Sequence, residues 1–304
     1  MDAPVELFAT ELVELVENRP ETALVVYPEL HLFGVRGPAR DRNEQLAAAA
    51  EPLTGPRMTA LAQLAGDLGV WLVPGSVCER GADGQLYNTA VVFSPAGELV
   101  ASYRKIFPWR PYEPYRPGSA FVTFDITGVG RAGLSICYDA WFPEVARHLA
   151  WMGAEVIVNP VLTTTVDRAQ ELVLAQASAI VNQVFVISVN AAGPVGTGRS
   201  VIVDPEGRVR AAAPSEHRTV LTDVIDLDQV TLVRRFGTAG LTRPWDQFRA
   251  EDAPLALPLY QGRIDPATWH PTDARPTDAR PTDARPTDAL PMPVPEVSGE
   301  RHQP

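Results

Sequence analysis

The chain has 304 residues, of which 45% are hydrophobic and 21% are charged, as is usual for a globular protein with a large buried core. Its formal net charge of −11 argues against nucleic acid or an anionic membrane as a partner, because both repel an acidic surface. Two cysteines exclude a disulfide framework, and no apolar run reaches the roughly 18 residues that a transmembrane helix needs. We therefore expect a cytoplasmic protein.

Patterns of apolar residues predict two helices and four strands in the first part of the chain. The helices carry their apolar residues on one face, and the strands are short apolar runs bounded by turn residues. The predicted helices cover 6–18 and 57–68, and the predicted strands cover 23–27, 70–77, 87–93 and 98–103. The last two strands form a hairpin across a Ser-Pro-Ala-Gly turn.

The same alternation continues from residue 132 to residue 212. The predicted helices cover 143–152 and 167–181, and the predicted strands cover 132–137, 155–159, 184–190, 199–203 and 208–212. The last two strands form a second hairpin, across an Asp-Pro-Glu-Gly turn. Because the two hairpins and the helix–strand units around them are alike, we expect an α/β fold. It would consist of two mixed sheets packed face to face, with helices outside.

The end of the chain is repetitive. The sequence PTDAR occurs at 271–275, 276–280 and 281–285, and PTDAL follows at 286–290. A proline in every five residues, with no apolar period, leaves too little burial to offset the entropy of ordering. We therefore expect one domain over residues 1–265 and a disordered low-complexity tail over residues 266–304.

Three reactive side chains each follow an apolar strand. Glu29 follows ALVVYP, Lys105 follows ELVASYR, and Cys137 follows AGLSI. In α/β folds, ligand sites gather at the carboxyl ends of strands, so we expect these three groups to meet. Lys105 is the only lysine among 26 lysine and arginine residues, and its compact ammonium can address a single atom.

Each of these residues also has a simpler interpretation. A cysteine is most often an inert core residue, which is how we interpret Cys78 in the middle of a predicted strand. Taken singly, Glu29 is most simply a solvated carboxylate.

Taken together, Glu29, Lys105 and Cys137 meet the needs of a nucleophilic thiol: Glu29 accepts its proton, and Lys105 favours the thiolate. Lys105 and the backbone N–H of Tyr138 would then stabilise an oxyanion.

Three sequence regions resemble the signatures of the nitrilase superfamily of carbon–nitrogen hydrolases. They are PEL at 28–30, YRKIFPW at 103–109 and SICYDAWFPE at 135–144, and GRSVIVDPEGRV at 198–209 is similar to the family's late hairpin. The resemblance implies a four-layer αββα sandwich and thiol-dependent hydrolysis of a non-peptide C–N bond. One departure is that the family opens with a strand carrying a Val-Ala-x-x-Gln pattern, whereas the first element predicted here is a helix.

Residue by residue, the resemblance implies that Cys137 is the nucleophile, Glu29 the general base and Lys105 the oxyanion stabiliser. Glu113, in RPYEPY, matches a second glutamate that positions the lysine and the substrate. Taken alone, Glu113 is most simply a surface carboxylate.

The aromatic residues near these motifs have two possible roles. Trp109, Tyr138 and Trp141 are either walls of the substrate pocket or ordinary core residues. The motifs favour a small amide, hydrolysed to a carboxylic acid and ammonia, with an N-carbamoyl amide or a nitrile as alternatives. A degenerate binding scaffold is the non-enzyme alternative.

No metal or organic cofactor is expected, because the five histidines show no ligand spacing and the implied chemistry needs none. The resemblance further implies a homodimer or a larger homo-oligomer. Its contacts would involve the outer helices and the segment near 234–248.

Overall fold

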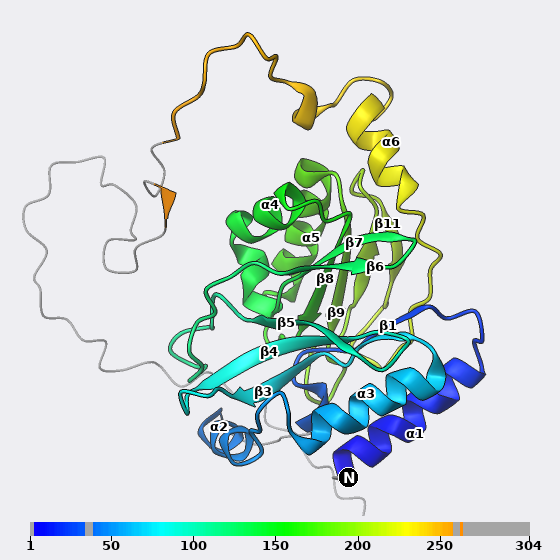
Figure 1. Cartoon of the computed structure of the whole chain (residues 1–304), viewed down its shortest axis with the longest axis vertical. Helices are drawn as coiled ribbons and strands as arrows, with labels where there is room; N and C mark the ends of the chain where they lie inside the picture. Colours follow the sequence, from blue (N-terminus) through cyan, green and yellow to red (C-terminus); the bar gives the residue numbers. More distant parts are fainter. Residues whose placement is uncertain (1–2, 34–38, 258–261, 264–304) are drawn as a thin grey trace, which may run out of the picture. The chain divides into compact units, whose positions relative to one another are not determined.

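The computed structural model describes residues 3–33, 39–257 and 262–263 of the chain (Figure 1). The chain divides into two compact units, Met1–Arg249 and Ala250–Pro304, and every helix and strand discussed below belongs to the first. The PTDAR repeats lie outside the described residues, so the tail stays a prediction. In the described part of the chain, no helix is both long and apolar enough to cross a membrane.

The first sheet has five strands. β1 pairs in parallel with β2, both β2 and β3 run antiparallel to β4, and β5 pairs with β4 on its other side. The strands are β1 (Leu24–Val26), β2 (Trp71–Val73), β3 (Ser76–Arg80), β4 (Leu86–Phe93) and β5 (Leu99–Arg104). The predicted hairpin is β4–β5.

The single strand predicted over 70–77 is wrong, because it is broken into β2 and β3 at Pro74-Gly75. Gly75 has φ +91°, a conformation that glycine adopts without steric cost. A Cβ at Gly75 would also overlap the carbonyl oxygen of Pro28. The break thus lets the backbone approach the segment that carries Glu29.

The second sheet has six strands in the order β11-β10-β9-β8-β7-β6. Its three central strands, β7, β8 and β9, are parallel and are joined by helical crossovers, while each edge is a hairpin. The strands are β6 (Thr123–Ile126), β7 (Gly130–Leu134), β8 (Val156–Val161), β9 (Phe185–Asn190), β10 (Val201–Val203) and β11 (Val209–Ala212). Strand β6 was not among the predicted elements.

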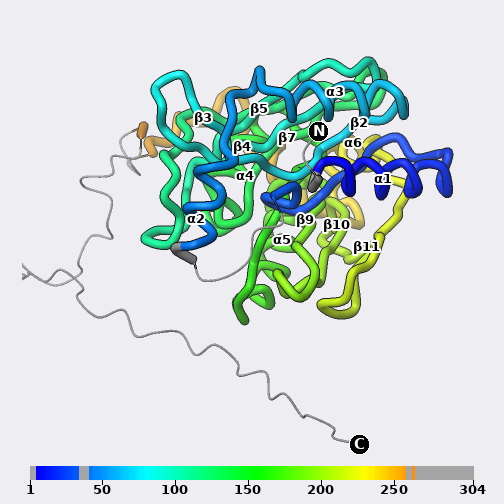
Figure 2. The backbone as a smooth tube through the Cα atoms, turned by 90° about the horizontal axis from the view of Figure 1, so that it is seen from below, coloured from blue at the N-terminus to red at the C-terminus, as the bar shows by residue number. Residues whose placement is uncertain are grey.

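The α-helices of the described residues are α1 (Ala3–Glu17), α2 (Ala39–Ala48), α3 (Pro56–Leu68), α4 (Pro143–Trp151), α5 (Arg168–Asn182) and α6 (Asp228–Phe236). Four of them cover the outer faces of the two sheets, whereas α6 packs Val230 against the core between the sheets. α1 and α3 lie side by side against the first sheet, and α4 and α5 pack together against the second (Figures 1 and 2). The helix–sheet–sheet–helix order confirms the predicted αββα sandwich.

The alternation of side chains along each strand explains why the strands read as continuous apolar runs. On β4, Val92 packs between the sheets, whereas Val91 and Phe93 pack against α1 and α3. On β8, Val158 packs between the sheets and Ile157 packs against α4 and α5. Because both faces of these strands are buried, no polar face breaks the apolar run.

Candidate active site

Glu29 lies in the loop directly after β1 and reaches across to the second sheet. Its backbone N–H donates to the carbonyl of Val161, at the end of β8, over 3.3 Å. The next residue, Leu30, has φ +52° and donates its N–H to the hydroxyl of Ser76 over 3.1 Å. These contacts fix a sharp bend that turns the Glu29 side chain into the interior, where it is only 2% exposed.

Lys105 lies directly after β5, and its side chain is fully buried. Its Nζ lies 3.0 Å from Glu29 Oε1, 2.7 Å from Glu113 Oε1 and 3.0 Å from Glu113 Oε2. Burial alone would lower the pKa of Lys105, but the charges of Glu29, Cys137 and Glu113 outweigh it. They hold the pKa well above its ordinary value, so the side chain is an ammonium.

Glu113 is held by its own loop. Its Oε2 accepts the backbone N–H of Trp109 over 3.2 Å, and its N–H donates to the Trp109 carbonyl over 2.9 Å. Burial raises the pKa of Glu113, as does the charge of Glu29, while the ammonium of Lys105 opposes the rise. The structure thus brings together the two glutamates and the lysine that the sequence singled out.

Asn88 is a member of this cluster that the sequence reasoning missed. It is fully buried on β4, and its Nδ2 donates to Glu29 Oε1 over 2.7 Å. Oε1 therefore accepts from both Asn88 and Lys105, whereas Oε2 has no hydrogen-bond partner among the described residues. One feature of the sequence could have indicated Asn88: it is a polar asparagine within the apolar run YNTAVVF.

Cys137 begins a short 3₁₀ turn, η2 (Cys137–Trp141), instead of ending a strand. The strand predicted over 132–137 is too long, because β7 ends at Leu134. Cys137 has φ +46°, which is rare for a residue with a side chain and is the kind of strained backbone found at functional sites. Its Sγ lies 4.0 Å from the hydroxyl of Thr163.

The charges of Glu29, Lys105 and Glu113 all act on the pKa of the Cys137 thiol. Burial raises the pKa of Cys137 well above its ordinary value, and the charge of Glu29 raises it further. The charge of Lys105 acts in the opposite direction. The thiol therefore stays protonated near neutral pH, and nucleophilic attack needs a base that removes its proton.

A second buried network begins at Thr163, whose hydroxyl lies near the thiol of Cys137. The Thr163 hydroxyl lies 2.7 Å from Glu171 Oε1, and Arg168 Nη1 lies 3.0 Å from Glu171 Oε2. Arg168 also donates to the hydroxyl of Ser188 over 3.1 Å and is only 2% exposed. Arg168 is the first residue of α5 and is ion-paired with Glu171.

The three aromatic residues near the motifs are all half-buried. Tyr138 makes an edge contact with Phe142 at 5.4 Å and lies 6.1 Å from Trp141, as measured between ring centroids. The Trp109 ring packs against Tyr112 at 4.4 Å. A role as pocket walls stays a prediction for all three.

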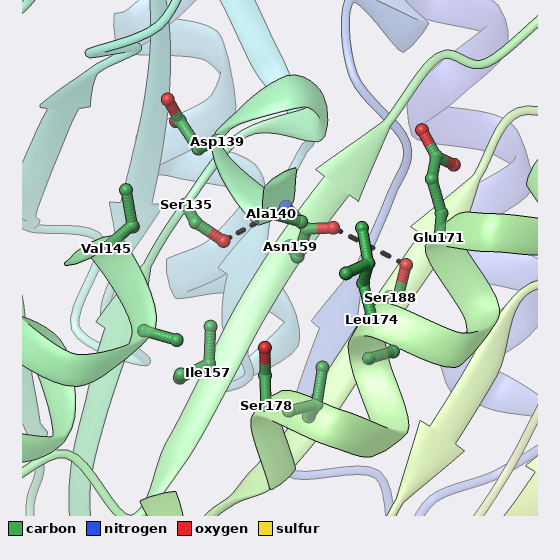
Figure 3. A pocket seen from close by; sticks show the side chains of 13 residues that line it. Ser135, Asp139, Ala140, Val145, Ile157, Asn159, Glu171, Leu174, Ser178 and Ser188 are labelled. Carbon is green, nitrogen blue, oxygen red and sulfur yellow. Dashed lines mark hydrogen bonds between the residues drawn. The ribbon is translucent and has the colours of Figure 1, made fainter. Parts of the chain in front are cut away.

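A separate cavity of about 30 Å³ lies beneath the η2 turn, between the second sheet and helices α4 and α5 (Figure 3). Asn159 bridges two serines in its wall, donating to Ser135 over 3.0 Å and accepting from Ser188 over 3.4 Å. Its volume is about that of one water molecule, which is too small for a substrate. Among the described residues, no group of three His, Cys, Asp or Glu side chains is arranged to hold a metal ion.

Comparisons with known proteins agree with this fold. A sequence model of the carbon–nitrogen hydrolase family matches residues 7–235. The omega-amidase NIT2 of Homo sapiens is 35% identical over 202 residues, which cover 61% of this chain and 72% of the relative. A (R)-stereoselective amidase of Pseudomonas sp is 38% identical over 233 residues, which cover 71% of this chain and 77% of the relative.

Solved structures give the same result. Saccharomyces cerevisiae Nit3, a member of branch 10 of the nitrilase superfamily, superposes with a TM-score of 0.69 at 28% identity. The match covers 77% of this chain and 87% of that one. A carbon–nitrogen hydrolase from Helicobacter pylori G27 superposes with a TM-score of 0.67 at 28% identity, over 76% and 86% of the two chains. The chain therefore belongs to the carbon–nitrogen hydrolase family of the nitrilase superfamily.

Proposed function

We propose that this enzyme hydrolyses the C–N bond of a small amide to a carboxylic acid and ammonia through a thioester at Cys137. The observation that carries the proposal is the buried contact of Lys105 Nζ with both Glu29 and Glu113, next to a thiol on a strained turn. A carboxylate, an ammonium and a thiol so arranged supply a base, an oxyanion stabiliser and a nucleophile.

Glu29 acts as the general base through its Oε2 atom. Its Oε1 is held by Asn88 and Lys105, so Oε2 is the oxygen left to accept the thiol proton. As the proton moves to Oε2, Cys137 Sγ attacks the carbonyl carbon of the amide. The raised pKa of Cys137 is the reason that this base is needed, because little thiolate exists beforehand.

Lys105 and the Tyr138 backbone stabilise the negative charge that develops on the carbonyl oxygen. Lys105 Nζ contacts Glu29 Oε1 and both oxygens of Glu113. In this mechanism the two oxygens of Glu113 share one N–H bond of the ammonium, and the third N–H bond binds the oxyanion. The Tyr138 N–H donates to no acceptor in the described part of the chain. Each such donor typically accelerates acyl transfer by about 10²–10³-fold.

The tetrahedral adduct then collapses to a thioester. The proton on Glu29 passes to the nitrogen as the C–N bond breaks, and ammonia leaves. Glu29, again a carboxylate, takes a proton from a water molecule that attacks the thioester carbon. This second adduct releases the carboxylic acid, and the proton on Glu29 returns to Cys137 Sγ.

An amide is favoured as substrate because both relatives named above are amidases by name. The alternatives are an N-carbamoyl amide, which presents the same carbonyl–nitrogen bond, and a nitrile. A non-catalytic scaffold is disfavoured, because such a protein has no need of a buried lysine between two carboxylates beside a thiol.

The test is ammonia release from a panel of short amides, N-carbamoyl amino acids and nitriles. We expect turnover of amides that is abolished in Cys137→Ala and kept in Cys78→Ala, which removes the other free thiol from a buried position. Turnover that persists in Cys137→Ala would contradict the mechanism. Turnover of nitriles alone would replace the amide with the alternative substrate.

We also propose that the enzyme is a homodimer or a larger homo-oligomer. Support comes from apolar side chains exposed on the outer helices, among them Val173 and Ile180 on α5 and Trp151 on α4. Exposed apolar groups of this kind are typical of protein–protein contacts. The cytoplasmic location stays a prediction.

A further inference from the structure

Asp139 is a fully buried carboxylate that the mechanism above does not use. It accepts three hydrogen bonds from neutral donors. Its Oδ2 accepts the hydroxyl of Tyr103 over 2.7 Å and the backbone N–H of Ile136 over 2.9 Å, and its Oδ1 accepts the backbone N–H of Phe107 over 2.9 Å. Three donors make it unusually well held for a side chain on a short turn.

The positions of these donors along the chain are informative. Tyr103 and Phe107 lie two residues before and two residues after Lys105. Ile136 directly precedes Cys137, and Asp139 follows Cys137 by two residues. Asp139 therefore accepts hydrogen bonds from residues on both sides of Lys105. It also accepts the N–H of the residue before Cys137 and itself lies just after Cys137, so it holds the turn on both sides of the thiol.

The two segments that Asp139 joins belong to different sheets. Lys105 follows β5 of the first sheet, whereas Cys137 begins the turn after β7 of the second. Apolar packing between two sheets does not fix their relative position to a fraction of an ångström, because it is not directional. The hydrogen bonds of Asp139 are directional and cross this gap.

The surroundings show that Asp139 is retained at a cost. Burial raises the pKa of Asp139, while the charge of Lys105 and the hydrogen bonds from Tyr103, Ile136 and Phe107 lower it. Behind Asp139 lies the small cavity, and the carboxylate points away from Ser135 and Asn159 in its wall (Figure 3). The η2 turn packs against α4, α5 and β8 on the cavity side, and the hydrogen bonds of Asp139 restrain it on the opposite side, towards β5.

We propose that Asp139 is a positioning residue that holds Lys105 at the correct distance from Cys137. The inference rests on the proposed function, in which Lys105 stabilises the oxyanion formed by attack of Cys137. The one N–H of Lys105 available for that oxyanion is useful only if it meets the oxygen attached to the attacked carbon. A displacement of about 1 Å at such a site lowers the rate by about 10²-fold.

The primary test is Asp139→Asn, which keeps the shape but can accept on only one of its two atoms. We expect kcat to fall at least tenfold while KM changes less than threefold. Asp125→Asn, at an exposed aspartate paired with Arg131, is the matched control and should leave both constants unchanged. Circular dichroism and thermal unfolding establish that each variant is folded at the assay temperature.

A second readout separates positioning from charge and from fold stability. The pH dependence of alkylation of Cys137 by iodoacetamide reports its thiol pKa, which Lys105 lowers. If Lys105 moves away in Asp139→Asn, the profile shifts to higher pH. Simple loss of a negative charge near the thiol would shift it to lower pH. This measurement needs no substrate, so it tests Asp139 even if the proposed amidase activity is absent.

Two outcomes would overturn the proposal. One is a folded Asp139→Asn variant with the wild-type alkylation profile, whatever its kcat and its melting temperature. The other is a profile shifted to lower pH. If Asp139→Asn does not fold, Tyr103→Phe carries the test, because it removes one donor and keeps both backbone bonds. We expect Tyr103→Phe to lower kcat about threefold and to shift the alkylation profile to higher pH by less than Asp139→Asn does. An unchanged alkylation profile in Tyr103→Phe would overturn the proposal.

Discussion

Glu29 affects the thiol in two opposite ways at the residue scale. As a base it takes the proton of Cys137 during attack, but its negative charge raises the pKa of Cys137 in the resting enzyme. A single substitution can separate these effects. Gln keeps the acceptor for Asn88 and Lys105 while removing both the charge and the basicity.

We therefore predict that Glu29→Gln lowers amide turnover by about 10²–10⁴-fold, the usual range for a general base. The same variant should alkylate faster at a given pH, because the folded-state pKa of Cys137 falls towards its ordinary value and more thiolate is present. Rates of ammonia release and of iodoacetamide incorporation across pH 6–10 measure the two effects. Glu98→Gln, at an exposed hairpin position, is the control. A profile shifted to higher pH would contradict the prediction.

Lys105 illustrates why the only lysine of an arginine-rich chain is informative. Its ammonium has no exposed surface and fits between the carboxylates of Glu29 and Glu113. A guanidinium is wide and planar and would overfill that space while directing its donors elsewhere.

We predict that Lys105→Arg lowers kcat by at least about 10²-fold even though the charge is conserved, since an oxyanion donor is lost. Lys105→Met should have a similar effect on kcat. The reverse exchange Arg208→Lys, at an exposed position in the second hairpin turn, should leave kcat unchanged. Steady-state ammonia release measures all three, and activity in Lys105→Arg close to wild type would show that charge alone suffices.

At the scale of the elements, Gly75 links the first sheet to the active-site loop. The strand is broken between β2 and β3 at Gly75, and this break brings the Gly75 backbone against Pro28, the residue before Glu29. Gly84 is a useful comparison, because it also has a positive φ, +77°, but a Cβ there would meet open space.

We predict that Gly84→Ala lowers the free energy of unfolding by about 1–2 kcal/mol, the cost of a left-handed alanine, and leaves kcat unchanged. Gly75→Ala should lose more stability and should also lower kcat about 10²-fold, because the Pro28 carbonyl must move and Glu29 moves with it. Urea unfolding and ammonia release test the pair. Equal kcat values in the two variants would refute the link between Gly75 and Glu29.

The elements that the sequence predicted well are those with an unambiguous pattern. The two hairpins, the parallel strands β8 and β9 and the helices α1, α3, α4 and α5 are runs of apolar residues with clear turn or cap residues at their ends. Strand β6, with the sequence TFDI, is too short and too polar to stand out. Helix α2, ARDRNEQLAA, has only a narrow apolar stripe, and α6 is only 9 residues long.

At the scale of the whole molecule, the sequence predicted that Glu29, Lys105 and Cys137 meet, because each follows an apolar strand. It did not predict the partners that hold them. Asn88 contacts Glu29 from 59 residues away, and Asp139 contacts Tyr103 from 36 residues away. Such pairs depend on how the two sheets are registered against each other, and no local pattern in either segment encodes that register.

The assembly of the whole molecule gives the last prediction. Val173 is 64% exposed on α5, and Ile180 lies on the same face seven residues later. If this face is a contact between copies, a buried charge there removes apolar contact and leaves an unpaired carboxylate. Val173→Asp should therefore convert the proposed homodimer to monomers in sedimentation velocity, without lowering the melting temperature of the monomer. Val129→Asp, 60% exposed between β6 and β7, is the matched control and should stay dimeric. A wild-type protein that sediments as a monomer at micromolar concentration would exclude this assembly.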